Sequence, residues 1–232
     1  MTKNKTWVIG DIHGEHKKLV DLLQLIKFDY DNDTLIQLGD VVDRGPDSYK
    51  CVEELLKIKN LISLRGNHDA TWMDSFYMGI NELQSQGGRE TLLSYTKDGN
   101  CENDPCKVEL RHQEFFQNQL NYYIDKNNNL FIHAGFDPEL PIKNQHESVF
   151  LWDRELMKMV WMWNKDKSLV DKKIPTIDNF NKIFIGHTPT VYFKTELPII
   201  AGGVYNLDTG CGKGPFPLTA MNVDTEEFFQ VK

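Results

Sequence analysis

The sequence predicts an α/β fold with parallel strands, because strand-like and helix-like patterns alternate along the first 70 residues. Three short apolar runs, at 6–9, 34–38 and 61–64, have the length of strands, and each leads into a corner that contains glycine. Between the first two runs, apolar residues at 19, 22, 23 and 26 recur at the spacing of one helix face. This alternation favours βαβ units, whose ligand crevice lies beyond the carboxyl ends of the strands.

The rest of the chain adds more helix, two further strands and a series of short apolar runs. Residues 70–128 are predicted to be largely helical, with a polar excursion at 98–107. Strands are expected at 130–133 and 182–185, separated by a helix rich in Trp and Met at 149–163. The last runs, at 199–200, 204–207, 218–223 and 228–231, predict an antiparallel second sheet that closes the core. We expect one domain over residues 1–232.

Composition and charge narrow the class of protein. Of the 232 residues, 40% are hydrophobic and 26% are charged, which is typical of a globular protein with its own core. The formal net charge of −8 disfavours a nucleic-acid backbone as partner. No apolar run is long enough to cross a bilayer and no signal peptide is recognisable, so we expect a cytoplasmic protein without a membrane partner. Cys101 and Cys106 lack a second Cys or His pair at matching spacing, which favours free thiols over a zinc site.

Metal-ligating side chains gather at the ends of the five predicted strands. Four of the seven histidines lie at these corners, beside glycine or another polar residue. Carboxylate, imidazole and amide ligands together suit borderline divalent metals such as manganese, iron, cobalt or zinc, and the absence of a thiolate argues against a closed structural zinc site. The corner residues are Asp11 and His13, then Asp40, Asp43 and Arg44, then Arg65, Asn67, His68 and Asp69, and finally His133 and His187.

Asp40 is placed to bridge two metal ions. It follows a central predicted strand, between two other ligand-bearing corners, and one carboxylate must be shared if two ions are to lie about 3.5–4 Å apart. A pair of metal ions lowers the pKa of a bound water and polarises a phosphoryl oxygen. Arg44 follows four residues later, and its guanidinium can hold the remaining phosphate oxygens by paired hydrogen bonds.

The blocks at 10–14 (GDIHG), 39–45 (GDVVDRG) and 65–69 (RGNHD) resemble the signature blocks of the metallophosphoesterases. Later segments at 131–135 (FIHAG), 151–155 (LWDRE) and 186–189 (GHTP) agree with them, and those at 87–95 and 207–210 are similar to prokaryotic members. The resemblance runs from Trp7 to Val223. Asp43 and Arg65 make it nearest to the bacterial and phage phosphoprotein phosphatases. Asp69 departs from that branch, where Glu is common.

This resemblance implies a two-sheet β-sandwich flanked by helices, in the order α/β/β/α. It also implies two divalent metal ions, with manganese expected and iron or zinc as alternatives. The ligands of the first metal would be Asp11, His13 and Asp40, and those of the second would be Asp40, Asn67, His133 and His187.

The resemblance also assigns roles in hydrolysis. His68, supported by Asp43, would be the general acid, and a water or hydroxide bridging the metals would attack phosphorus directly. Arg65 would either support Asp43 or contact the substrate. The expected phosphate and substrate contacts are Arg44, Arg154, Asn67 and Arg65.

Three functions are open at this point. The favoured one is hydrolysis of phosphoserine or phosphothreonine, with a phosphoprotein or phosphopeptide as partner. The alternative is a dinucleoside polyphosphate hydrolase acting, for example, on diadenosine tetraphosphate; its symmetrically cleaving kind tends to lack the counterparts of Asp43 and Arg65. A non-catalytic scaffold is disfavoured because every expected metal and acid position is intact. The oligomeric state is not predicted.

Overall fold

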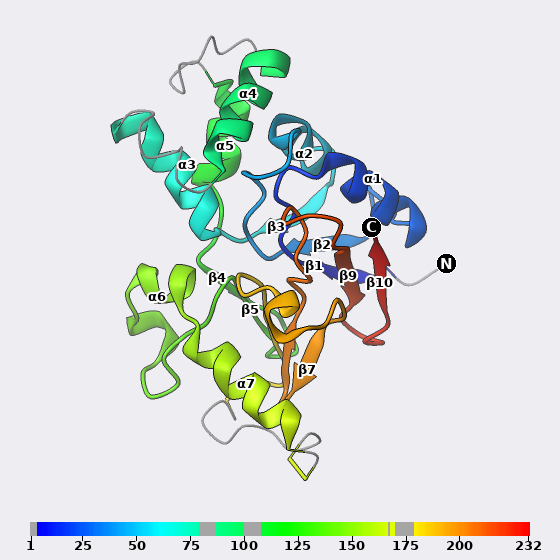
Figure 1. The fold of residues 1–232 in the computed structure, drawn as a ribbon, viewed down its shortest axis with the longest axis vertical. Coiled ribbons are helices and arrows are strands. Elements are labelled where there is room, and N and C mark those ends of the chain that lie inside the picture. Colours follow the sequence, from blue (N-terminus) through cyan, green and yellow to red (C-terminus); the bar gives the residue numbers. More distant parts are fainter. Residues whose placement is uncertain (1–3, 79–86, 100–107, 167, 170–178) are drawn as a thin grey trace.

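The structure, a computed structural model, describes residues 4–78, 87–99, 108–166, 168–169 and 179–232. Its described strands form two five-stranded sheets (Figure 1). The first sheet has the order β10 (Phe228–Val231), β9 (Leu218–Asn222), β1 (Thr6–Ile9), β2 (Thr34–Gln37) and β3 (Asn60–Ser63). The second has the order β4 (Tyr122–Ile124), β5 (Leu130–Ile132), β6 (Ile183–Ile185), β8 (Val204–Asn206) and β7 (Ile199–Ala201).

The parallel strands predicted for the first third of the chain are confirmed. Trp7 pairs with Leu35, and Leu35 pairs with Leu61, so β1, β2 and β3 run side by side in one direction. In the second sheet, β5 and β6 are also parallel. The carboxyl ends of all five strands bear the corner residues that the sequence singles out.

The alternation of side chains along β1 divides the core. Val8 faces the second sheet and packs in one cluster with Phe131 and Phe184, whereas Trp7 and Ile9 face the helices on the outside. Because successive strand residues point to opposite faces, a buried strand of this kind needs an apolar layer on both sides. Phe131 and Phe184 stack with their ring centroids 4.9 Å apart between the two sheets.

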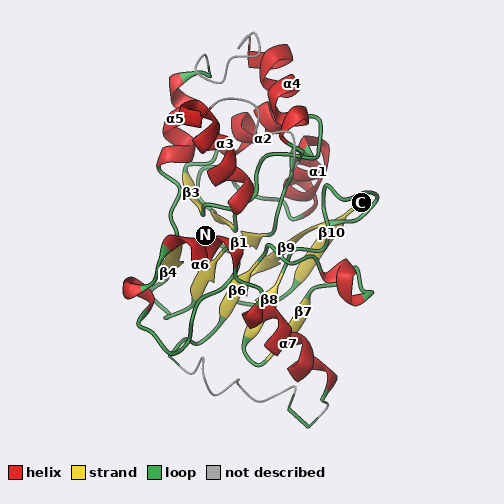
Figure 2. Ribbon diagram, turned by 60° about the vertical axis from the view of Figure 1, so that its left-hand side comes forward, coloured by secondary structure: helices red, strands yellow, loops and turns green. Residues whose placement is uncertain are grey.

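Helices cover the outer faces of the sheets (Figure 2). Over the first sheet lie α1 (His16–Leu25) and α2 (Ser48–Leu55), and α7 (Glu155–Lys165) packs on the second. This α/β/β/α arrangement is the predicted fold class. The remaining described elements are α3 (Asn67–Met78), α4 (Gly88–Gly99), α5 (Leu110–Gln117), η3 (Ile142–Asn144), α6 (Glu147–Trp152) and η5 (Thr190–Phe193).

Two expectations about the second half are wrong. The C-terminal runs do not form a sheet of their own: β7 and β8 join the second sheet, while β9 and β10 return to the first, where β9 pairs antiparallel with β1. Short apolar runs carry no information about which sheet edge they extend. The helix expected at 149–163 is two helices, α6 and α7, separated at Asp153 and Arg154.

The strand β4 was not predicted from the sequence. In the described parts of the chain, no helix combines the length and the apolar character needed to span a bilayer. Cys101 and Cys106, and most of the polar excursion at 98–107, lie outside the described residues.

Candidate metal centre and phosphate cleft

The corners after β2 and β3 meet because two glycines let the backbones touch. Gly39 has φ +102°, and a Cβ at this position would lie 2.7 Å from the backbone nitrogen of Gly66. A Cβ at Gly66 would lie 2.1 Å from Oδ1 of Asp40. Any larger residue would push the corners apart, so these glycines set the distance between the groups that follow them.

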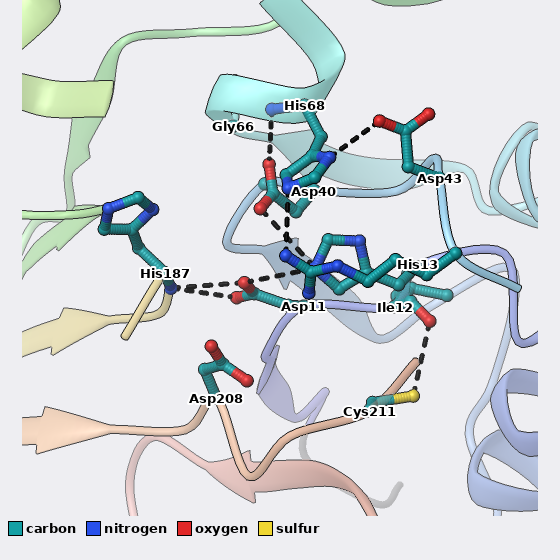
Figure 3. A network of polar contacts seen from close by, with 12 residues as sticks. Asp11, Ile12, His13, Asp40, Asp43, Gly66, His68, His187, Asp208 and Cys211 are labelled. Atoms are coloured by element: carbon teal, nitrogen blue, oxygen red, sulfur yellow. Dashed lines mark hydrogen bonds and ion pairs between the residues drawn. The ribbon is translucent and has the colours of Figure 1, made fainter. Parts of the chain in front are cut away.

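All six predicted metal ligands are buried. Figure 3 shows four of them, Asp11, His13, Asp40 and His187, close together at this edge of the two sheets. Oδ2 of Asp40 lies 3.6 Å from Nε2 of His13 and 3.5 Å from Nε2 of His133. Asn67 Oδ1 lies 3.2 Å from Nε2 of His133 and 2.8 Å from Nδ1 of His187. Asp40 is therefore shared by two groups of ligand atoms, which are His13, Asp40 and His68 on one side and Asp40, His133 and His187 on the other.

Asp11 completes the set from the end of β1. Its Oδ2 lies 3.9 Å from Nε2 of His13, and both its carboxylate oxygens accept hydrogen bonds from the backbone nitrogen of His187 at 3.2 Å. The first and the last of the predicted ligands along the chain therefore touch each other.

Backbone carbonyls fix the orientation of two of the imidazoles. Nδ1 of His13 donates to the carbonyl of Val42 at 2.8 Å, and Nδ1 of His133 donates to that of Leu38 at 2.8 Å. In a neutral imidazole a donating Nδ1 makes Nε2 the unprotonated nitrogen, and in both residues Nε2 is turned toward Asp40, as a metal ligand requires.

The charges of the cluster fit divalent cations. Burial, together with the nearby carboxylates of Asp208 and Asp40, raises the pKa of Asp11 well above its usual value. Burial lowers the pKa of both His13 and His187, which keeps these imidazoles neutral. Among the buried side-chain atoms of the described residues that lack a hydrogen-bond partner, two lie at this site, namely Nε2 of His187 and Oδ2 of Asp208. The cluster thus has several close carboxylates whose negative charge is not fully balanced, and neutral imidazoles beside them. This is the donor set of borderline divalent metals.

Asp69, the position that departs from many phosphoprotein phosphatases, holds two corners together. Its carboxylate accepts hydrogen bonds from the backbone nitrogens of Asp40 and Val41, each at 2.9 Å, and from that of Gly66 at 3.2 Å. Gln119 adds a fourth bond at 3.0 Å. The Asp69 side chain, one methylene shorter than Glu, therefore holds the corner that bears Asp40 in place through these hydrogen bonds.

The backbone at the site is strained in a consistent way. Non-glycine residues with positive φ occur at His13, Asp40, Asp43, Arg44 and His187, with φ between 48° and 71°. Such conformations cost of the order of 1–3 kcal/mol each and persist only where the surroundings enforce them. The strain turns the ligand side chains inward at three different corners.

His68 is held by a carboxylate and lies beside an arginine. Its Nδ1 contacts Oδ2 of Asp43 at 2.6 Å, and Nη2 of Arg44 lies 2.9 Å from its Nε2, while Nη1 of Arg44 contacts His13. Burial lowers the pKa of His68, but the charge of Asp40 and the bond to Asp43 outweigh it and raise that pKa overall. The overall shift of the His68 pKa favours the charged form of the imidazole, although the Arg44 guanidinium beside Nε2 opposes it.

Arg154 reaches the same cleft because the chain leaves its helical path between α6 and α7. It is the N-cap residue of α7, and its Nη1 donates to Oγ1 of Thr188 at 3.3 Å. A cavity of about 420 Å³ opens over the cluster and is lined by Arg154, Arg44 and His68 among others.

The structure does not bring Arg65 into this cleft. Nη1 of Arg65 pairs with Glu147 at 2.8 Å, and the residue lines a neighbouring hollow. Its described contacts also do not include Asp43.

Several residues of the site were not assigned from the sequence. Thr91 of α4 accepts a hydrogen bond from the backbone nitrogen of Asp43 at 2.8 Å and donates to its Oδ1 at 2.7 Å. Trp152, the last residue of α6, is 45% exposed and lines the cleft. Tyr192 of η5 and Lys213 line the same cleft. Thr91 and Trp152 lie in the segments 87–95 and 151–155, which resemble those of family members, whereas Tyr192 and Lys213 lie outside the resembling segments.

Comparison with known proteins places this site in a family. The profile of the calcineurin-like phosphoesterases matches residues 5–198. The chain belongs to this family. Calcineurin-like phosphoesterases use a dinuclear divalent metal site, and the two ligand groups that share Asp40 are present here.

Its relatives among the calcineurin-like phosphoesterases differ in substrate. Serine/threonine-protein phosphatase 1 of Salmonella typhimurium is 25% identical, over 79% of this chain and 78% of the relative. A symmetrical bis(5'-nucleosyl)-tetraphosphatase of Coxiella burnetii is 24% identical, over 97% of this chain and 91% of the relative. The crystal structure of a candidate diadenosine tetraphosphatase aligns with a TM-score of 0.68 at 20% identity, over 99% of this chain and 94% of that one. These relatives share the fold and the class of reaction but leave the substrate open.

Proposed function

We propose that this chain hydrolyses phosphoserine and phosphothreonine in proteins as a metal-dependent phosphomonoesterase. The observation that carries this proposal is the bond of 2.6 Å between Asp43 and His68 beside the buried cluster. A serine or threonine alkoxide is a poor leaving group and needs a proton as it departs, so a general acid contributes strongly to its release. The leaving group of a polyphosphate is a phosphate anion, which departs without one.

Each side chain has a task that its geometry suits. His68 would donate its Nε2 proton to the departing oxygen, and Asp43 would hold the imidazole in orientation and stabilise its charged form. Arg44 and Arg154, which both line the cleft, would bind phosphate oxygens and offset the charge that develops in the transition state.

The cluster would hold the metals between the two sheets. Asp11, His13 and Asp40 would bind one ion, and Asp40 would share the other with Asn67, His133 and His187. When bound, two such ions acidify water and polarise the phosphoryl oxygen. We propose manganese as the metal, with iron or zinc as alternatives.

A second candidate function, hydrolysis of a dinucleoside polyphosphate, is favoured by Trp152. This half-exposed indole lies at the cleft with its ring centroid 6.1 Å from that of His187. An exposed aromatic face next to a phosphate site can stack on a nucleobase. The symmetrical tetraphosphatase relatives are consistent with this alternative.

One assay compares the two candidates. The protein is stripped of metal, reloaded with manganese and given a phosphothreonine peptide or diadenosine tetraphosphate at equal concentration, with Asp40→Asn as the blank. We expect a higher kcat/KM on the peptide. Faster cleavage of the nucleotide would transfer the protein to the polyphosphate hydrolases, and the absence of both activities above the blank would favour a non-catalytic role.

A further inference from the structure

The cleft over the metal centre continues into a second hollow. This hollow, of about 570 Å³, shares Arg44, Tyr192 and Lys213 with the first and ends at Phe216. A substrate whose phosphate lies between Arg44 and Arg154 would therefore extend past Lys213. Apart from Arg44, the residues that line this second hollow have no assigned role in the hydrolysis itself.

The loop that bears Lys213 is fixed against the metal centre. Gly212 has φ +77°, and a Cβ there would lie 2.5 Å from the Cβ of His13 and 3.4 Å from that of Arg44. The thiol of Cys211 contacts the carbonyl of Ile12 at 3.3 Å, and the backbone nitrogen of Lys213 donates to Gly210 at 3.0 Å. The position of Lys213 relative to the scissile phosphate is thus set by the backbone and does not depend on its own side chain.

Lys213 is a cation at the cleft of an acidic protein, and its charge offsets part of the rise in the pKa of the buried Asp208 carboxyl. Several lysines pair with carboxylates, as Lys50 does with Asp47 and Lys182 with Glu226. Among the described residues, Lys213 has no such ion pair, and its Nζ lies 5.2 Å from the ring centroid of Tyr192. The aromatic ring orients the ammonium without cancelling its charge. Lys213 therefore lies against the ring of Tyr192, beside the cleft that both residues line.

We propose that Lys213, oriented by Tyr192, binds a second anionic group of the substrate, namely an acidic or phosphorylated side chain next to the phosphoresidue that is hydrolysed. This inference rests on the proposed function and specifies its substrate class as acidic phosphopeptides. An ammonium on a flexible stem is a point charge that accepts a carboxylate or a phosphate oxygen in several orientations, whereas the two arginines suit the scissile group.

The experiment measures kcat/KM for two phosphothreonine peptides that differ only in Glu or Gln at the residues flanking the phosphothreonine. The wild-type protein should prefer the acidic peptide by about five-fold, the value of a partly exposed ion pair. Lys213→Ala should abolish the preference, mainly through KM, and Lys213→Glu should reverse it. Lys213→Arg should keep it, and so should the matched control Lys59→Ala, which removes an exposed lysine just before β3, at the amino end of the sheet.

The outcomes separate this inference from the proposed function. A wild-type protein that hydrolyses both peptides with equal kcat/KM, or a preference that survives Lys213→Glu, overturns the subsite alone. Failure of the wild-type protein on both peptides, with diadenosine tetraphosphate cleaved, overturns the proposed function. If in addition Lys213→Ala raises KM for that nucleotide, the second anion is part of a polyphosphate and the assignment to peptides is wrong.

Discussion

At the scale of single residues, His68 should determine how strongly the rate of hydrolysis depends on the leaving group. We expect His68→Asn to slow hydrolysis of an alkyl phosphate by about 100-fold or more, because general acid catalysis contributes that much when the leaving oxygen needs a proton. Hydrolysis of p-nitrophenyl phosphate should fall far less, since its phenolate leaves without help. Steady-state rates on the two esters test this, and equal losses would exclude the acid role.

Asp40 is the one carboxylate that both ligand groups share. Asp40→Asn should lose bound metal and activity together, because the amide supplies neither the charge nor the second ligand oxygen. Metal content after gel filtration and phosphatase activity are measured on the same sample. Glu139→Gln, an exposed carboxylate beyond the β5 corner, is the control and should keep both. A fully active Asp40→Asn protein would contradict the bridging assignment.

At the scale of elements, α4 acts on the site through Thr91. Thr91→Val keeps the shape but removes both hydrogen bonds to Asp43, so His68 loses part of its support. We expect kcat on an alkyl phosphate to fall roughly ten-fold with little change in KM, as for the loss of one or two buried hydrogen bonds. Thr91→Ser should restore kcat. A rise in KM alone would mean that Thr91 shapes the substrate pocket instead.

The packing of α2, α4 and α5 predicts a pH dependence of stability. His112 is buried, with Nδ1 at 2.9 Å from the Tyr95 hydroxyl and Nε2 at 2.6 Å from Glu53. Burial lowers its pKa, although Glu53 and Glu109 raise it in part and Arg111 lowers it further. Because the folded pKa lies below the unfolded value of about 6.5, the unfolded chain binds the proton more readily, and stability should fall as pH drops below about 6.5.

His112→Gln tests this, because glutamine stays polar but does not titrate. Urea unfolding at pH 7.5 and at pH 5.5 should show a smaller loss of unfolding free energy in the variant than in the wild-type protein. An identical loss in both would assign the pH dependence to other groups.

At the scale of the whole molecule, the metal centre joins the two sheets. Asp11, Asp40 and Asn67 follow strands of the first sheet, and His133 and His187 follow strands of the second. Metal that binds only the folded state should therefore stabilise the entire fold, by about 2.7 kcal/mol at a free concentration 100 times its Kd. Thermal unfolding with and without manganese measures this. The shift should be largely lost in Asp40→Asn, and an equal shift there would place the stabilising metal elsewhere.

The parallel strands and the corners that bear the ligands could be predicted from local pattern for a simple reason, whereas the two-sheet sandwich and the grouping of the ligands around two metals came from resemblance to a family. Strand, glycine and ligand are neighbours along the chain at Asp11, Asp40 and His187, so local pattern and parallel topology suffice. Arg154 came only from resemblance, because its place depends on the break between α6 and α7. The position of Lys213 at the cleft depends on the close approach of Gly212 to His13, two residues far apart in the sequence, so no local pattern predicts it. The same limit explains why β9 and β10 were assigned to the wrong sheet.

The position of β9 has a consequence for a chain that is still being synthesised. β1 lies between β2 and β9, so the strand made first is enclosed only by residues made near the end. A polypeptide interrupted before Leu218 leaves one hydrogen-bonding edge of β1 open, next to the corner that carries Asp11 and His13, and such an edge is a site for association with other chains. Translation that stops early would thus yield an inactive product prone to aggregation, and hydrolysis would begin only after β9 has emerged.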